Sequence, residues 1–139
     1  MIIGIGTDIV SIDRIKKAIQ RWEGRFLDRI YTKEELSFCF LKRDPFPHLA
    51  GRFAAKEAAI KALSNITGSS KTLALQGQKI KNLKMADIEI IKNKKGAPHI
   101  VVKNPCLIPE KMNIKIHVTI SHEKTYAIAT VVIERVDSG

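Results

Sequence analysis

Residues 49–63 read LAGRFAAKEAAIKAL, and this stretch decides the class of fold. Its six alanines give it a high helix propensity. Gly51 opposes that propensity by about 1 kcal/mol relative to alanine. A small residue at this point indicates close packing or the close approach of a ligand. We therefore predict a long helix over residues 49–63.

Two shorter helices are predicted before it. Ser11 should cap the first of them, because apolar residues then recur at spacings of three and four. These residues, which should form one buried stripe, are Ile12, Ile15, Ile19, Trp22 and Phe26. Thr32 and Glu35 have the spacing of a capping box, which predicts a second helix over residues 33–41. The prolines within residues 44–47 should end it.

A β-hairpin is predicted in the second half of the chain. Residues 88–91 and 99–102 are rich in isoleucine and valine, and they flank the segment NKKGAP at residues 93–98. Two apolar runs separated by such a turn are typical of a hairpin. Residues 2–7, which read IIGIGT, are expected to form a further short strand.

Two longer strands are predicted near the end of the chain. Isoleucine and valine alternate with polar residues over 114–120, which is typical of a half-buried strand. Residues 126–133 are apolar on both faces and should form a central strand. Helices come early and strands late, so we predict an α+β fold with a mostly antiparallel sheet packed against the long helix and the shorter helices. Residues 64–71 read as a loop, and residues 64–86 receive no role.

The composition suits one domain over residues 1–139, because 45% of the 139 residues are apolar. No run approaches the roughly 18 apolar residues that span a bilayer, so no membrane insertion is expected. The first residues lack the pattern of a signal peptide, which favours a cytoplasmic protein. Cys39 and Cys106 form no CxxC pair, and they indicate two reduced thiols rather than a zinc site.

The formal net charge of +10 favours an anionic partner. Nucleic acid, a membrane surface, a phosphorylated cofactor and an acidic protein would all fit that charge. A nucleic-acid-binding domain is the main alternative to an enzyme. However, no nucleic-acid motif is present, and aromatic residues make up only 6% of the chain, which leaves few platforms for stacking bases. We therefore expect no nucleic-acid partner.

Three charged side chains are candidates for chemistry. Asp8 follows the predicted first strand, where an isolated aspartate is most often a cap or a turn residue. Glu57 and Lys61 are four positions apart and share one face of the predicted long helix. They form either a surface ion pair, worth about 0.3–0.5 kcal/mol, or a site for a metal and a phosphate. Because Mg²⁺ on a phosphorylated ligand needs only one or two carboxylates, Asp8 and Glu57 would suffice if the fold brings them together.

Three segments together resemble the holo-acyl-carrier-protein synthase family. They are GIGTDIV at residues 4–10, LAGRFAAKEA at residues 49–58 and HVTISHEKTYA at residues 117–127. The run GRFAAKEA is highly specific, and the order and spacing of the three segments also match. One departure is LSNITG at residues 63–68, where the family usually has a Gly-Thr-Gly loop.

This resemblance implies a 4′-phosphopantetheinyl transferase-like fold and activity. Such enzymes move phosphopantetheine from coenzyme A to a serine of acyl carrier protein and release adenosine 3′,5′-bisphosphate. Asp8 and Glu57 would hold Mg²⁺, Lys61 would contact phosphate, and Asp8 would help to deprotonate the serine directly or through water. Arg52 and His122 would bind the nucleotide end, although a lone histidine in a turn is more often solvated than a ligand. The resemblance also implies a homotrimer with sites between subunits and a role in fatty acid biosynthesis.

A basic stripe is predicted on the first helix, beside its buried stripe. On a helical wheel, Arg14, Lys17, Arg21 and Arg25 fall on one side. Glu23 is the only acid between Arg14 and Arg25, so these charges lack local partners. A solvated face is the ordinary interpretation of such residues. The alternative is that they bind the acidic acyl carrier protein, since opposite charges speed association.

Overall fold

The computed structural model describes residues 1–66, 84–108 and 111–137. Its helices are α1 (Ile12–Trp22), α2 (Gly24–Ile30), α3 (Lys33–Phe40) and α4 (Phe46–Ile66), with 3₁₀ turns η1 (Met85–Asp87) and η2 (Pro105–Leu107). Its strands are β1 (Ile2–Ser11), β2 (Ile88–Lys92), β3 (Pro98–Val102), β4 (Ile114–His122) and β5 (Tyr126–Arg135). None of the helices in these described ranges is long and apolar enough to cross a membrane.

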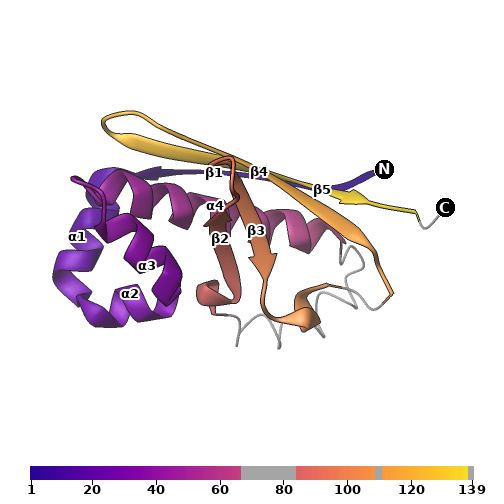
Figure 1. Cartoon of the computed structure of the whole chain (residues 1–139), viewed down its shortest axis with the longest axis horizontal. Helices are drawn as coiled ribbons and strands as arrows, with labels where there is room; N and C mark the ends of the chain where they lie inside the picture. The colour runs from indigo at the N-terminus through magenta and orange to yellow at the C-terminus, as the bar shows by residue number, and fades with distance from the viewer. Residues whose placement is uncertain (67–83, 109–110, 138–139) are drawn as a thin grey trace.

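The strands form two antiparallel sheets, which confirms the predicted α+β class. One sheet has the order β1-β5-β4, and β2 pairs with β3 in a separate hairpin. β5 is the central strand, as its apolar character on both faces predicts. The three-stranded sheet lies along one side of α4, while α1, α2 and α3 gather at one end of the molecule (Figure 1).

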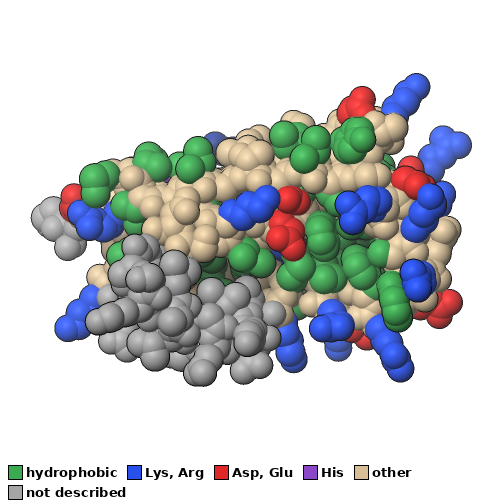
Figure 2. Space-filling view, turned by 180° about the vertical axis from the view of Figure 1, so that it is seen from behind, with side chains coloured by type: hydrophobic (Ala, Val, Ile, Leu, Met, Phe, Trp, Pro, Cys, Tyr) green, Lys and Arg blue, Asp and Glu red, His purple; other side chains and the backbone are tan. Residues whose placement is uncertain are grey.

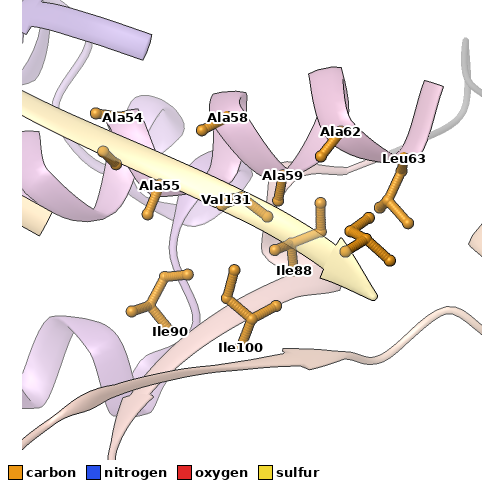
Figure 3. Packing of buried hydrophobic residues seen from close by; sticks show 12 residues of the cluster. Ala54, Ala55, Ala58, Ala59, Ala62, Leu63, Ile88, Ile90, Ile100 and Val131 are labelled. Carbon is orange, nitrogen blue, oxygen red and sulfur yellow. The ribbon is translucent and has the colours of Figure 1, made fainter. Parts of the chain in front are cut away.

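Helix α4 is the centre of the hydrophobic core. Its alanines pack between the three-stranded sheet and the β2–β3 hairpin, where Val131 approaches from one side and Ile88, Ile90 and Ile100 from the other (Figure 3). Alanine leaves room for both sheets to approach the helix backbone closely. Gly51 serves the same purpose, because a Cβ at this position would lie 2.9 Å from Ile120 of β4.

Helix α4 is longer than residues 49–63, the predicted range. It begins at Phe46 because Pro47 falls in its first turn, where a backbone N–H has no helical partner to lose. It ends at Ile66, so the first three residues of the loop predicted over 64–71 are helical. The rest of that loop, and residues 67–83 as a whole, lie outside the described residues.

The single long stripe predicted from Ile12 to Phe26 is wrong. Ser11 caps α1 as predicted, but the helix ends at Trp22 and α2 begins after a break. Glu23 stands in that break with φ of 46°, a left-handed conformation that interrupts helical periodicity. Trp22 is consequently 51% exposed rather than buried.

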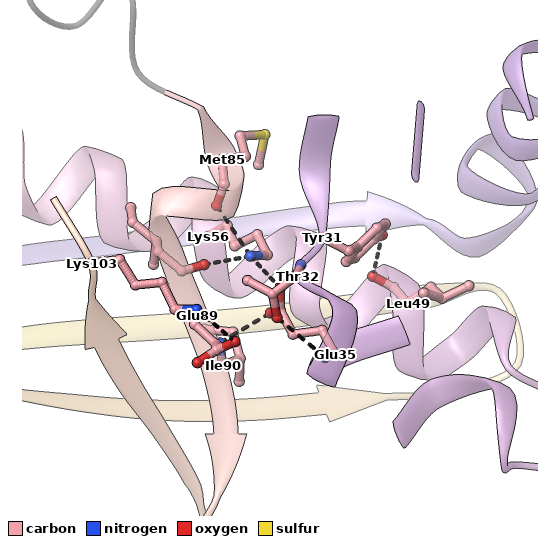
Figure 4. A network of polar contacts seen from close by, with 10 residues as sticks. Tyr31, Thr32, Glu35, Leu49, Lys56, Met85, Glu89, Ile90 and Lys103 are labelled. Atoms are coloured by element: carbon pink, nitrogen blue, oxygen red, sulfur yellow. Dashed lines mark hydrogen bonds and ion pairs between the residues drawn. The ribbon is translucent and has the colours of Figure 1, made fainter. Parts of the chain in front are cut away.

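A buried ion pair joins α4 to α3 and to the hairpin (Figure 4). The side chains of Lys56 and Glu35 are both 0% exposed, and Lys56 Nζ donates to Glu35 Oε1 over 2.7 Å. Lys56 also donates to the carbonyl oxygens of Met85 and Ile88, while Glu35 Oε2 accepts from the Ile90 N–H. Burial lowers the pKa of Lys56, and the negative charge of Glu35 opposes that change. The Lys56 ammonium and both carboxylate oxygens of Glu35 therefore have hydrogen-bond partners.

Replacing Lys56 by methionine should lower the free energy of unfolding by about 3–5 kcal/mol, because Glu35 is left as an unpaired buried charge. Urea denaturation measures the change. The double variant Lys56→Met/Glu35→Leu is the matched control and should recover most of the loss, since it removes both charges. A single variant as stable as the natural chain would show that the pair does not hold these elements together.

Candidate active site

Asp8 lies inside β1 and not after its end, so its prediction as a cap or turn residue is wrong. The strand continues to Ser11, and Asp8 is opposite Ala129 of β5. Side chains alternate along a strand, so Asp8 shares the face of Gly4 and Gly6 that packs on α4. Both glycines are buried, and a Cβ on Gly6 would lie 2.9 Å from the Ala62 nitrogen and would overlap the Ala58 carbonyl. Glycine therefore lets the strand, and Asp8 with it, reach the helix.

Lys61 of α4 meets Asp8 across this contact. Its Nζ donates to Asp8 Oδ1 and to the Thr7 carbonyl oxygen, each over 3.0 Å. The Asp8 side chain is 18% exposed and the Lys61 side chain 52% exposed, so the pair lies at the molecular surface. Lys61 therefore forms its ion pair with Asp8. The surface ion pair between Glu57 and Lys61, which their helix spacing allows, is not found among the described residues.

Glu57, one turn before Lys61, is half-buried beside the same pair. Burial raises the pKa of Glu57 above its ordinary value, and the negative charge of Asp8 raises it further. The Lys61 ammonium acts in the opposite direction. The two carboxylates are thus close enough to repel each other, and a positive charge between them is favourable.

The donor set of Asp8 and Glu57 fits a magnesium ion. Carboxylate oxygens are the ligands that Mg²⁺ prefers, and a phosphorylated ligand and water complete its coordination. No group of three or more metal-binding side chains occurs among the described residues, so a metal here would depend on such a ligand. The repulsion between the two carboxylates is a second reason why a cation is favoured at this point.

Arg52 and His122 belong to a second group on another side of α4. The Arg52 guanidinium lies 4.3 Å from the centre of the Phe38 ring, and the Phe38 and His48 rings are 6.2 Å apart. The His48 and His122 rings are 5.7 Å apart and meet edge to face. His122 is the last residue of β4 and not part of the turn where the sequence places it. A chain of ring contacts thus joins the two predicted residues.

Three cations surround Phe38 in this second group. The ammonium groups of Lys42 and Lys92 lie 4.7 and 4.8 Å from the ring centre, in addition to Arg52. Arg52 is 5% exposed, and its Nε has no hydrogen-bond partner among the described residues. Burial and the neighbouring positive groups lower the pKa of His48. The positive charge of this second group favours the binding of an anion.

Sequence reasoning missed Phe38, His48, Lys42 and Lys92. His48 could have been found, because it precedes Arg52 by four positions on the same helix. The other three come from α3, the segment after α3, and β2. No sequence spacing relates them to α4.

The basic residues predicted for partner binding are exposed, but they do not form one stripe. Arg14, Lys17 and Arg21 lie on α1, whereas Arg25 lies on α2 beyond the break at Glu23. The interpretation that these charges lack local acidic partners is wrong for Lys17, whereas Arg21 contacts an aromatic ring instead of an acid. Lys17 pairs with Asp13 over 2.8 Å, and the Arg21 guanidinium lies 5.1 Å from the centre of the Trp22 ring system.

Comparison with known proteins places the chain in a family. The sequence model of the 4′-phosphopantetheinyl transferase superfamily matches residues 4–131. The chain belongs to this superfamily. A curated relative from Thermodesulfovibrio yellowstonii, named holo-[acyl-carrier-protein] synthase, is 41% identical over 133 residues, which cover 96% of this chain and 99% of the relative.

Solved structures of this superfamily agree with the fold. The Helicobacter pylori holo-[acyl-carrier-protein] synthase in complex with coenzyme A has a TM-score of 0.71 and is 35% identical, with 94% of this chain and 99% of that chain covered. The Bacillus anthracis holo-(acyl-carrier-protein) synthase, in complex with CoA (3′,5′-ADP), has a TM-score of 0.69 and is 31% identical, with 96% of both chains covered.

Gly6→Ala tests whether the close approach of β1 builds the site. The added methyl group should force the strand away from α4, lower the free energy of unfolding by about 1–3 kcal/mol and separate Asp8 from Lys61. Thermal unfolding and a crystal structure of the variant measure both effects. Gly24→Ala is the matched control, because nothing lies within 4 Å of a Cβ at that position. An unchanged Asp8–Lys61 distance in a stable Gly6→Ala variant would contradict this account.

Proposed function

We propose that the chain transfers the 4′-phosphopantetheine group from coenzyme A to a serine of an apo-acyl carrier protein. The meeting of Asp8, Glu57 and Lys61 at the β1–α4 contact carries this proposal. Membership of the transferase superfamily and the names of the curated relatives support it. The reaction releases adenosine 3′,5′-bisphosphate and serves fatty acid biosynthesis in the cytoplasm. In this proposal residues 1–139 belong to a single phosphopantetheinyl transferase domain.

In this mechanism the protein positions groups and neutralises charge, as in phosphoryl transfer generally. Asp8 and Glu57 would hold Mg²⁺, which would supply charge neutralisation and polarise the phosphoryl group that is transferred. Asp8, directly or through a water, accepts the proton of the serine hydroxyl. The serine oxygen bonds to the phosphorus next to pantetheine, and the bond to the bridging oxygen breaks. Lys61 stabilises negative charge on the departing phosphate.

Arg52 and His122 bind the nucleotide end of coenzyme A in this proposal. The buried Nε of Arg52 has no hydrogen-bond partner among the described residues, which supports an anionic group there, because an unsatisfied buried donor is costly. Lys42 and Lys92 add positive charge around Phe38. The His48 and His122 rings add flat surfaces beside it.

A homotrimer with sites between subunits fits the geometry of α4. Arg52 and Glu57 are five positions apart, which is about 140° round a helix, so they face different directions. In this proposal one coenzyme A contacts Glu57 of one copy and Arg52 of a neighbouring copy, so each site lies between two subunits. The outer face of the three-stranded sheet supplies an apolar surface for this contact, with Ile5 58%, Ile9 62% and Ile128 41% exposed. Hydrophobic side chains gather along the edge where this sheet lies (Figure 2).

The acyl carrier protein docks on α1 in this proposal. Arg14 and Arg21 are exposed on that helix, and neither forms an ion pair with an acidic side chain among the described residues. Arg25 on α2 extends the basic surface. Lys17 joins this surface when an acidic group of the carrier replaces Asp13 as its ion-pair partner. An acidic helix of the carrier would bring opposite charges together and raise the rate of encounter.

Glu57→Gln should lower the turnover of coenzyme A by about two to three orders of magnitude, because a lost metal ligand removes several kcal/mol of transition-state stabilisation. Release of adenosine 3′,5′-bisphosphate measures it, and chelation of divalent ions should abolish release by the natural chain. Asp137→Asn, which neutralises an exposed carboxylate near the chain end, should leave turnover unchanged. Full activity of Glu57→Gln at ordinary Mg²⁺ concentration would exclude Glu57 as a ligand.

Mixing two inactive variants tests the shared site. Glu57→Gln and His122→Ala subunits should form some intact sites after subunit exchange, and random trimers would recover about a quarter of natural activity. Each variant exchanged with itself is the control. Light scattering should report a trimer. A monomer, or a mixture as inactive as its components, would exclude sites shared between subunits.

The double reversal Arg14→Glu/Arg21→Glu should raise the KM for the carrier protein at least about tenfold, because attraction becomes repulsion. The KM for coenzyme A should change little. Lys33→Glu/Lys111→Glu is the matched control, since it makes the same charge change at exposed lysines outside α1. If both double variants have the same KM for the carrier protein, the basic face of α1 is only solvated and does not bind the carrier.

A further inference from the structure

Lys61 bonds to an oxygen atom of Asp8, one of the two carboxylates proposed to hold a divalent cation. Its ammonium bonds to Asp8 Oδ1 and to the Thr7 carbonyl oxygen, each over 3.0 Å. It also opposes the rise in the pKa of Glu57 that burial and Asp8 cause. Lys61 therefore acts on both carboxylates, through an ion pair with Asp8 and through its charge on Glu57.

We propose that Lys61 competes with the divalent cation for Asp8, so that metal binding frees its ammonium to bind the phosphates of the ligand. This inference rests on the proposed metal site of Asp8 and Glu57. Mg²⁺ binds oxygen at roughly 2.0–2.1 Å and accepts little distortion of its coordination shell. An ammonium on the same oxygen would remain within a few ångströms of the ion and repel it. The two cations therefore exclude each other at Asp8 Oδ1.

The side chain of Lys61 is suited to this exchange. This side chain is 52% exposed, so the ammonium can leave Asp8 without breaking into the core. A lysine carries a compact charge on a flexible four-carbon stem, and its three donors can turn to new acceptors. By contrast, Lys56, five positions earlier on α4, is 0% exposed and held by three acceptors. One helix thus has a fixed lysine in the core and a movable lysine at the site.

Lys61 could instead help the metal to bind, and removing it would then change the metal affinity in the opposite direction. If Lys61 held Asp8 in the orientation that a metal requires, removing it would weaken metal binding. If Lys61 competes, removing it strengthens metal binding. A measurement of metal affinity without coenzyme A therefore separates the two roles, and it does not depend on turnover.

Mn²⁺ binding, followed by electron paramagnetic resonance, tests the inference on the whole protein, and calorimetry repeats the test with Mg²⁺. Lys61→Met should bind Mn²⁺ about tenfold more tightly than the natural chain, as expected from removing one positive charge close to the ion in a surface site. Lys61→Arg should retain the natural affinity, because it keeps the charge. Lys33→Met, which removes a charge from α3, should not change it. Methionine is a good helix former, so the variant should fold.

Inorganic pyrophosphate provides a second readout. When it is present, the difference between Lys61→Met and the natural chain should disappear, because the released ammonium then binds phosphate. The inference is overturned if Lys61→Met, without pyrophosphate, binds Mn²⁺ no more tightly than the natural chain does. If Glu57→Gln also binds Mn²⁺ as the natural chain does, the proposed metal site itself fails. If Glu57→Gln loses binding, only the competition by Lys61 fails.

Discussion

The contact between two glycines of β1 and the backbone of α4 is the constraint on which the candidate site depends. Gly4 and Gly6 face Ala62 and Ala58 so closely that a Cβ at either glycine would overlap a carbonyl oxygen of the helix. Asp8 follows on the same face of the strand, within hydrogen-bond reach of Lys61. Two elements more than 50 positions apart in sequence thus share one cluster of charges.

The other side of α4 is fixed by a different interaction. Lys56 is buried and bonded to Glu35 and to the backbone of the β2 region, whereas the adjacent Glu57 is half-buried and feels the negative charge of Asp8. Consecutive residues of a helix point about 100° apart, so holding one sets the direction of the other. The buried ion pair therefore positions a proposed metal ligand, although it lies outside the site.

Sequence patterns predict local elements well where one interaction decides them. The Thr32–Glu35 capping box and the alternation in β4 both appear as predicted. The break at Glu23 was missed, because the apolar spacing continues through it and a left-handed residue leaves no periodic signal. Asp8 was expected after the strand because pairing with β5, which extends β1 to Ser11, depends on residues far along the chain. The cations around Phe38 were missed for the same reason.

In the proposed function, the charges gathered where β1 meets α4 promote transfer of phosphopantetheine to an acyl carrier protein. Mass spectrometry of an apo-carrier protein, incubated with the enzyme, coenzyme A and Mg²⁺, tests it most directly. We expect a phosphopantetheine adduct on one serine of the carrier, and no adduct when Asp8→Asn replaces the natural chain. An unmodified carrier after incubation with the folded natural protein, or equal modification by Asp8→Asn, would contradict it.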